Sequence, residues 1–207
     1  MGTLTGFLLI FPLFIMAVVV HEVSHGLVAE ALGDPTARRA GRLTLNPLRH
    51  VDPIGTVLLP LFLRLIHAPF VFGWAKPVPI NFANLRHPKR DVLWIGAAGP
   101  AANFLLAGGT ALLLKMAGPA LPAVAAGLLR YLALINLMLG TFNLLPVPPL
   151  DGSRVLVGLL PARWAVGFLL LERWGIVLVM LLLYSGVIDR VIWPTVAWLA
   201  QVLELGM

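Results

Sequence analysis

Long apolar runs separated by short polar loops dominate this chain. Four runs cover about residues 6–32, 92–116, 121–145 and 165–188. A helix needs about 20 apolar residues to cross about 30 Å of hydrocarbon, and each of these runs is long enough. We therefore predict an all-α polytopic membrane protein with about four to six transmembrane helices.

Two shorter runs do not fit a simple crossing. Residues 191–205 are apolar but few, and Pro194 lies near their start, which indicates a helix in the interface or one that returns partway. Residues 54–72 are interrupted by prolines and contain Arg64 and His67. This second run is typical of a re-entrant segment, provided that protein or water shields its backbone.

The distribution of basic residues supports re-entry of residues 54–72. Four arginines precede this run and four basic residues follow it: Arg38, Arg39, Arg42, Arg49, Lys76, Arg86, Lys89 and Arg90. A full crossing would divide them equally between the two sides, whereas re-entry leaves them all on one face with Arg154 and Arg163. The positive-inside rule then makes this face cytoplasmic and puts the N-terminus outside.

Composition agrees with a membrane protein. The chain is 59% hydrophobic and 12% charged, whereas soluble domains carry roughly 25% charged residues. The absence of cysteine excludes disulfides, cysteine metal sites and thiol catalysis. A net charge of +6 would suggest nucleic acid for a soluble protein, but these charges lie in loops. We expect the lipid bilayer as partner and no nucleic acid.

The first apolar run contains the sequence HEVSH, with His21, Glu22 and His25. Positions i and i+4 share one face of a helix, so both imidazoles can bind one ion while Glu22 reaches a water on it. Each ionisable residue in such a run costs about 2.5 to 3.5 kcal/mol on insertion scales, so these side chains need partners in the bundle. The pattern predicts a zinc-hydrolase site. A buried hydrogen-bonded cluster without metal is the alternative.

Two histidines and a water leave tetrahedral zinc one ligand short. Asp151 is the best-placed candidate, because the prolines between Asn143 and Gly152 break the helix and present a carboxylate just after the break. The alternative is that Asp151 caps a helix that begins near Gly152. The remaining candidates are Glu30, His50, His67, His87, Asp91, Glu172 and Asp189.

Two asparagines are further candidates for the site. Asn103 lies within an apolar helix, where its amide can contact substrate or the oxyanion, or else form an interhelical hydrogen bond. Asn143 opens the proline-rich segment that ends at Gly152. Residues 73–81, GWAKPVPIN, alternate β-formers with prolines and indicate a short edge strand or a re-entrant loop.

Together these motifs resemble the site-2 protease family of intramembrane zinc metalloproteases (peptidase family M50). HEVSH is followed about 120 residues later by NLLPVPPLDG, and the match includes RLTLNPLRHVDPIG at 42–55, GWAKPVPIN at 73–81 and GPAANF at 99–104. The resemblance covers roughly residues 14–156 and is to the compact prokaryotic type, without a PDZ or CBS domain. It implies that His21, His25 and Asp151 bind one Zn²⁺ ion and that Glu22 activates water. It also favours a substrate contact for Asn143, which opens NLLPVPPLDG.

We therefore expect an intramembrane zinc metalloprotease that acts on membrane proteins with a transmembrane helix, as in regulated intramembrane proteolysis. One protease domain would occupy residues 1–207, with its catalytic core at about 6–156 and C-terminal helices at about 164–207. The cell (inner) membrane is the expected location, with the active site toward the cytoplasm. A zinc transporter and a non-catalytic scaffold are the alternatives; a transporter predicts polar residues along a pathway, whereas here they gather at one depth.

Overall fold

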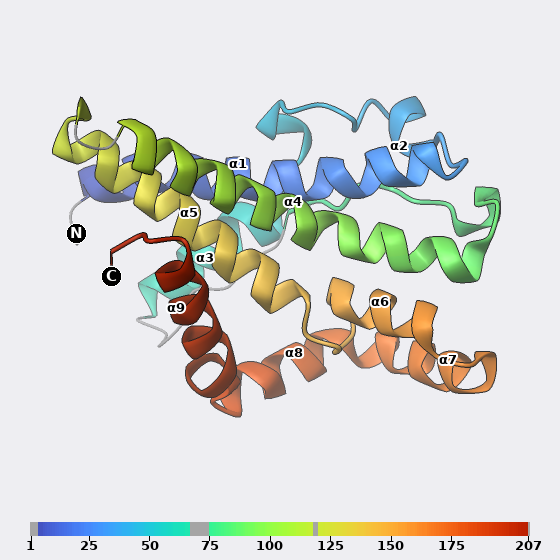
Figure 1. Ribbon diagram of the computed structural model, residues 1–207. Coiled ribbons are helices and arrows are strands. Elements are labelled where there is room, and N and C mark those ends of the chain that lie inside the picture. Colours follow the sequence, from blue (N-terminus) through green and yellow to red (C-terminus); the bar gives the residue numbers. More distant parts are fainter. Residues whose placement is uncertain (1–3, 67–74, 118–119, 207) are drawn as a thin grey trace.

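Three long helices form the centre of the molecule. The structure, a computed structural model, describes residues 4–66, 75–117 and 120–206. Helices α1 (Leu4–Ala31), α4 (Pro88–Ala117) and α5 (Ala123–Asn143) run lengthwise and pack on one another, as Figure 1 shows. The N- and C-terminal ends of the chain lie near the same end of this bundle.

Four stretches are long and apolar enough to cross a membrane within the described part of the chain. They are Leu9–Ala31, Pro88–Ala117, Ala123–Asn143 and Ala162–Tyr184. No strand occurs among the residues that the structure describes. The prediction of an all-α, multi-pass membrane protein is confirmed.

Helix α4 occupies the middle because small residues let its neighbours approach closely. A Cβ added to Gly96 would stand 2.8 Å from Cβ of Arg154. A Cβ added to Gly140 of α5 would likewise stand 3.0 Å from Cζ of the Phe104 ring. Without a hydrophobic force between helices in lipid, such close contact is a main source of helix association.

A second set of contacts holds the C-terminal helices to this bundle. Ala107, Leu137, Ile192 and Val196 are among the members of one buried apolar cluster. The cluster joins α4 and α5 to η6 (Ile188–Ile192) and α9 (Trp193–Val202). In Figure 1, α9 runs across the bundle rather than along it, which agrees with the predicted interfacial or partial return of residues 191–205.

The segment predicted to re-enter the membrane begins and ends at one place. It contains η2 (Pro53–Leu58) and α3 (Leu59–Leu65), which are together too short for a full crossing. The backbone N–H of Lys76 donates to the carbonyl of His50 at 2.9 Å. The two flanks of this segment are therefore in contact, and its re-entry into the membrane stays a prediction. His67 and residues 67–74 lie outside the described part.

The chain after this excursion follows the loop alternative. Residues 75–81 have no regular secondary structure, and η3 (Phe82–Asn84) follows them. Asp34, near the short helix α2 (Thr36–Arg39), holds this return segment in place through hydrogen bonds. Its carboxylate accepts from the backbone N–H of Asn81 at 2.7 Å and from the Asn84 amide at 2.8 Å. Another short helix, η1 (Pro47–Arg49), precedes the excursion.

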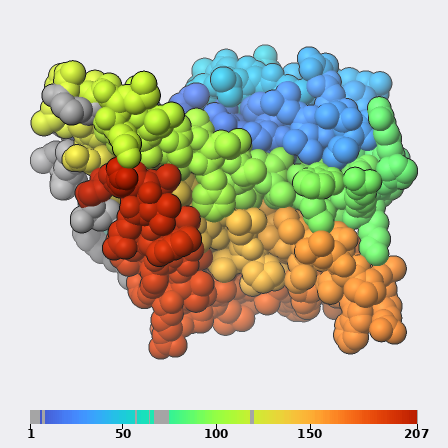
Figure 2. All heavy atoms as spheres, in the orientation of Figure 1, coloured from blue at the N-terminus to red at the C-terminus, as the bar shows by residue number. Residues whose placement is uncertain are grey.

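The last predicted transmembrane helix differs in detail from the expectation for residues 165–188. Helix α6 (Asp151–Leu159) leads into α7 (Ala162–Leu169), and a 3-10 turn, η5 (Leu170–Trp174), separates α7 from α8 (Gly175–Tyr184). The charged residues Glu172 and Arg173 lie in this turn. The run as a whole is apolar, so its mean hydropathy does not reveal these two residues. Figure 2 shows α5 recessed between the α6–α7 region and the C-terminal helices.

Candidate metal centre

Helix α1 places two imidazole rings side by side in the protein interior. His21 and His25 are 6% and 4% exposed, and their ring centroids lie 4.7 Å apart. Their Nε2 atoms are 3.1 Å apart. The spacing of four residues brings both rings to the same side of the helix, as the sequence predicted.

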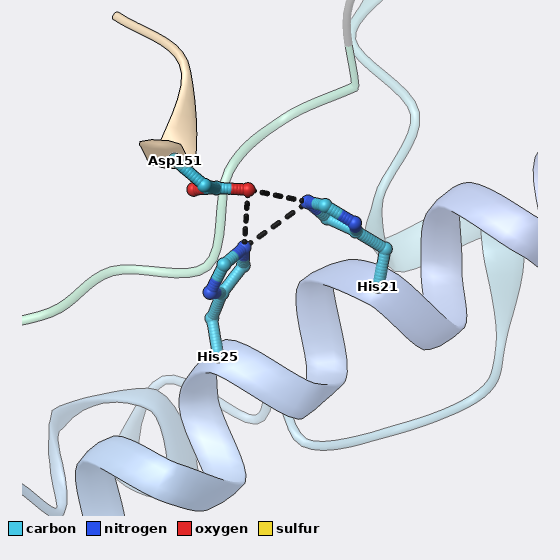
Figure 3. A group of neighbouring side chains, drawn as sticks. All are labelled: His21, His25 and Asp151. Atoms are coloured by element: carbon cyan, nitrogen blue, oxygen red, sulfur yellow. Dashed lines mark hydrogen bonds and ion pairs between the residues drawn. The ribbon is translucent and has the colours of Figure 1, made fainter. Parts of the chain in front are cut away.

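The carboxylate of Asp151 meets these two rings from a distant part of the chain. Its Oδ2 lies 2.9 Å from Nε2 of His21 and 3.1 Å from Nε2 of His25, as Figure 3 shows. Asp151 is the first residue of α6 and Leu150 is the cap residue, with no side-chain cap hydrogen bond. The Asp151 carboxylate thus contacts both imidazoles, as the ligand alternative requires, and its role as a metal ligand stays a prediction.

Glycine at position 152 lets the chain turn tightly enough to deliver Asp151. A Cβ at Gly152 would lie only 2.1 Å from the carbonyl oxygen of Leu144, at the end of α5. The chain therefore doubles back on itself between α5 and α6. No larger residue fits this turn without a backbone shift, so the glycine after Asp151 is a steric requirement.

The three side chains fit a zinc ion. Their ligand atoms all lie within 4.8 Å of one another, and they form the one group of this kind among the described residues. Tetrahedral bonds of 2.0 to 2.1 Å put neighbouring ligand atoms roughly 3.3 Å apart, close to the observed separations. Two imidazole nitrogens and a carboxylate oxygen are also a donor set typical of catalytic zinc.

Backbone and amide groups hold the far side of each ring. Nδ1 of His25 donates to the carbonyl oxygen of Ile95 at 2.6 Å. Nδ1 of His21 contacts Oδ1 of Asn103, also at 2.6 Å. With Nδ1 engaged in this way, each Nε2 can present a lone pair to a metal.

Glu22 lies beside the site and is held by the return segment. One oxygen of its carboxylate accepts from the backbone N–H of Val78 at 2.9 Å. The side chain of Glu22 is only partly buried, whereas His21, His25 and Asp151 are buried. Val78 lies between two prolines, so it provides the one backbone N–H of that tripeptide.

The two asparagines have different surroundings. Asn103 is fully buried, and its amide is engaged with His21 and with Asn136, which corresponds to the interhelical alternative. Asn143 at the end of α5 donates to Leu139 of the same helix at 3.0 Å and is half-buried. Substrate contact by either residue stays a prediction.

The remaining candidate ligands in the described part of the chain lie elsewhere. Glu30 pairs with Arg38, and the carboxylate of Asp91 accepts from the backbone N–H of His87 at 2.8 Å. Nε2 of His50 contacts the carbonyl oxygen of Thr44 at 2.9 Å. None of these candidates joins the metal group.

Sequence reasoning did not anticipate the supporting residues. Gly99 opens the GPAANF motif and was not predicted as a site residue, yet a Cβ there would stand 2.5 Å from both histidine rings. Asn136 was not among the predicted site residues either, and its side chain accepts a hydrogen bond from Asn103. Polar side chains in apolar helices are the signal that could have indicated Asn136, because such residues need a partner.

The fold and the site define a polytopic membrane protein with a buried group of two histidines and one carboxylate that could hold a metal ion. The model of a family described as peptidase family M50 matches residues 113–182, a stretch that includes Asp151. Two relatives are named "Putative zinc metalloprotease". YwhC of Bacillus subtilis (strain 168) is 36% identical over 187 residues, which cover 87% of this chain and 82% of YwhC. Rip2 of Mycolicibacterium smegmatis is 28% identical over 196 residues, 93% of this chain and 73% of Rip2.

The archaeal Zinc metalloprotease MJ0392 of Methanocaldococcus jannaschii is 28% identical over 155 residues, which are 75% of this chain but 35% of that protein. No solved structure gives a significant match. The chain belongs to peptidase family M50. It is a site-2 protease-like zinc metalloprotease, and zinc is its metal, so the transporter and scaffold alternatives are not supported.

Proposed function

We propose that this enzyme hydrolyses peptide bonds in or next to transmembrane segments of other membrane proteins, as in regulated intramembrane proteolysis. The observation that carries this proposal is the position of the metal centre. His21 and His25 lie within a candidate span and are buried together with Asp151. A site held by a membrane-spanning helix can reach substrates that soluble proteases cannot.

We assign His21, His25 and Asp151 as the zinc ligands. Zinc held by these residues would polarise a scissile carbonyl and lower the pKa of a water molecule toward 7. Glu22 takes a proton from the attacking water and delivers it to the leaving amine. The Val78 N–H holds one carboxylate oxygen of Glu22 and leaves the other for this proton transfer.

Substrate handling falls to the residues around the break between α5 and α6. A helical substrate must unwind first, because its carbonyls are engaged in the helix ladder. The Asn143 amide donates one hydrogen to its own helix, so its oxygen and second hydrogen can contact unwound substrate backbone. Asn103 is enclosed by its protein partners, which favours a supporting role over substrate contact.

The substitution Glu22→Gln tests the proposed mechanism. It keeps size and removes the proton acceptor, so we expect cleavage of a single-pass substrate to fall at least about 100-fold, as is usual for loss of a general base. Zinc content should stay at one ion per chain. Glu30→Gln on the same helix is the matched control and should retain activity. Normal turnover by Glu22→Gln would refute its role.

We further propose that the site faces the cytoplasmic side of the cell (inner) membrane, in one protease domain spanning residues 1–207. The basic loops at 38–49 and 76–90 support this orientation by the positive-inside rule. The chain has no cysteine, so single cysteines can report topology. In intact cells, a membrane-impermeant thiol reagent should label Ala123→Cys and spare Arg39→Cys. The reverse pattern would overturn the orientation.

A further inference from the structure

Two fully buried asparagines extend inward from the metal centre. Asn103 of α4 and Asn136 of α5 are both 0% exposed. Nδ2 of Asn103 donates to Oδ1 of Asn136 at 2.7 Å, and Oδ1 of Asn103 faces Nδ1 of His21 at 2.6 Å. A continuous hydrogen-bonded path therefore joins α5, through α4, to a histidine of α1.

Asn136 determines which groups along this path donate and which accept. Nδ2 of Asn136 donates to the carbonyl oxygen of Leu132 at 2.8 Å. A backbone carbonyl can only accept, so the Asn136 amide must turn its own oxygen toward Asn103. Asn103 must then present its Nδ2 to Asn136 and its oxygen to His21. A longer contact from Asn103 to the carbonyl of Ala17, at 3.4 Å, requires the same orientation.

This orientation determines which nitrogen of His21 carries the proton. The amide oxygen of Asn103 accepts, so Nδ1 of His21 must donate and Nε2 keeps its lone pair on the side of His25 and Asp151. His25 reaches the same state through the carbonyl of Ile95, which also only accepts. A reversed Asn103 amide would instead place an N–H against Nδ1 of His21 and favour a proton on Nε2.

We propose that Asn103 and Asn136 are positioning residues that prepare His21 for zinc, with Asn136 setting the orientation of the Asn103 amide. The inference rests on the proposed role of His21 as a ligand. In an apolar bundle the two amides cost insertion free energy, which their mutual hydrogen bonds offset. Both side chains are fully buried and bonded to protein groups, so their effect should appear first in metal affinity.

Zinc affinity of the purified full-length protein in detergent, measured by competition with a chromophoric chelator, tests this proposal without any substrate. We expect Asn136→Leu and Asn103→Leu each to weaken zinc binding by about 10- to 100-fold, the usual effect of lost outer-shell partners. Thr110→Val is the matched control. Thr110 is a buried α4 residue bonded only within its own helix, and its variant should bind zinc like the wild type.

Coupling between the two asparagines distinguishes two explanations. In a relay, Asn136 acts on His21 through Asn103; otherwise each substitution disturbs packing independently. The double variant should bind zinc no more weakly than Asn103→Leu alone, because Asn136 acts through Asn103. Additive losses, or normal affinity in Asn136→Leu, would overturn the inference. Wild-type protein that binds no zinc would instead refute the metal site itself.

A measurement on the unaltered protein avoids any question of folding. Nitrogen NMR of ¹⁵N-histidine-labelled, zinc-loaded protein should show the His21 ring protonated at Nδ1 and bound through Nε2. His21→Gln provides the assignment among the five histidines of the chain. A His21 ring bound through Nδ1 would contradict the proposed relay.

Discussion

Gly99 lies directly against the ring of His21. A Cβ placed on this glycine would stand 2.5 Å from Cε1 of His21 and equally close to Nε2 of His25. Real side-chain carbons do not approach so closely, so the absence of a side chain at position 99 leaves the room that the two rings occupy. α4 thus shapes the metal centre without providing a ligand.

Gly99→Ala should therefore abolish zinc binding while the helix itself tolerates alanine. The added methyl must displace one or both imidazoles, and we expect zinc affinity and peptidase activity to fall at least about 100-fold, as geometry at a metal site tolerates little displacement. Gly108→Ala, on the same helix with nothing within 4 Å of its Cβ position, is the control. Equal zinc affinity in both variants would contradict this account.

The turn that delivers Asp151 should fail when Gly152 gains a side chain. With the Leu144 carbonyl only 2.1 Å from the Cβ position, Gly152→Ala must shift backbone and should destabilise the protein by about 3 kcal/mol or more, the upper range for overpacking. Thermal unfolding in detergent measures this. Gly127→Ala, in open space on α5, should be neutral or stabilise by up to about 1 kcal/mol.

The Val78 N–H should matter for turnover rather than for metal binding. Val78→Pro removes the donor that holds Glu22, and loss of a hydrogen bond to a charged group costs about 1.5 to 3 kcal/mol. We expect kcat to fall about 10- to 100-fold with unchanged zinc content. Val78→Ala keeps the N–H and should retain most activity. Wild-type kcat in Val78→Pro would show that the hydrogen bond from Val78 to Glu22 has no role in turnover.

Asp34 should make the protein sensitive to acid. Burial opposes ionisation of its carboxyl, but hydrogen bonds from Thr36, Asn84 and Asn81 outweigh burial and hold the pKa of Asp34 below its ordinary value. Because the native pKa is depressed, this stabilisation is fully present above the unfolded pKa of about 4 and is lost as pH falls through the native value.

Thermal unfolding between pH 2 and pH 8 tests the role of Asp34. The wild type should lose stability on the acid side, whereas Asp34→Asn should start about 1 to 3 kcal/mol less stable at neutral pH and change less with acid. Asp189→Asn is a control outside this hydrogen-bonded group. Identical acid profiles for the wild type and Asp34→Asn would show that Asp34 does not fasten the return segment.

Much of this protein is determined by the sequence itself. Apolar runs of about 20 residues form helices in the bilayer, because lipid offers no hydrogen-bond partner to backbone N–H and C=O groups. The i, i+4 spacing of His21 and His25 places them on one side of any helix. The broken, proline-rich segment before Asp151 cannot continue a plain helix, so the Asp151 carboxylate follows a break in the chain.

Only the tertiary structure decides how these parts meet. Asp151 lies 126 residues from His25 along the chain, and no local rule gives that distance in space. The path from His21 through Asn103 to Asn136 depends on the packing of three helices, as does the fit of Gly99 against the rings. Local patterns fix helices and faces because they depend on neighbouring residues. Side-chain contacts between helices depend on crossings that the whole chain settles together.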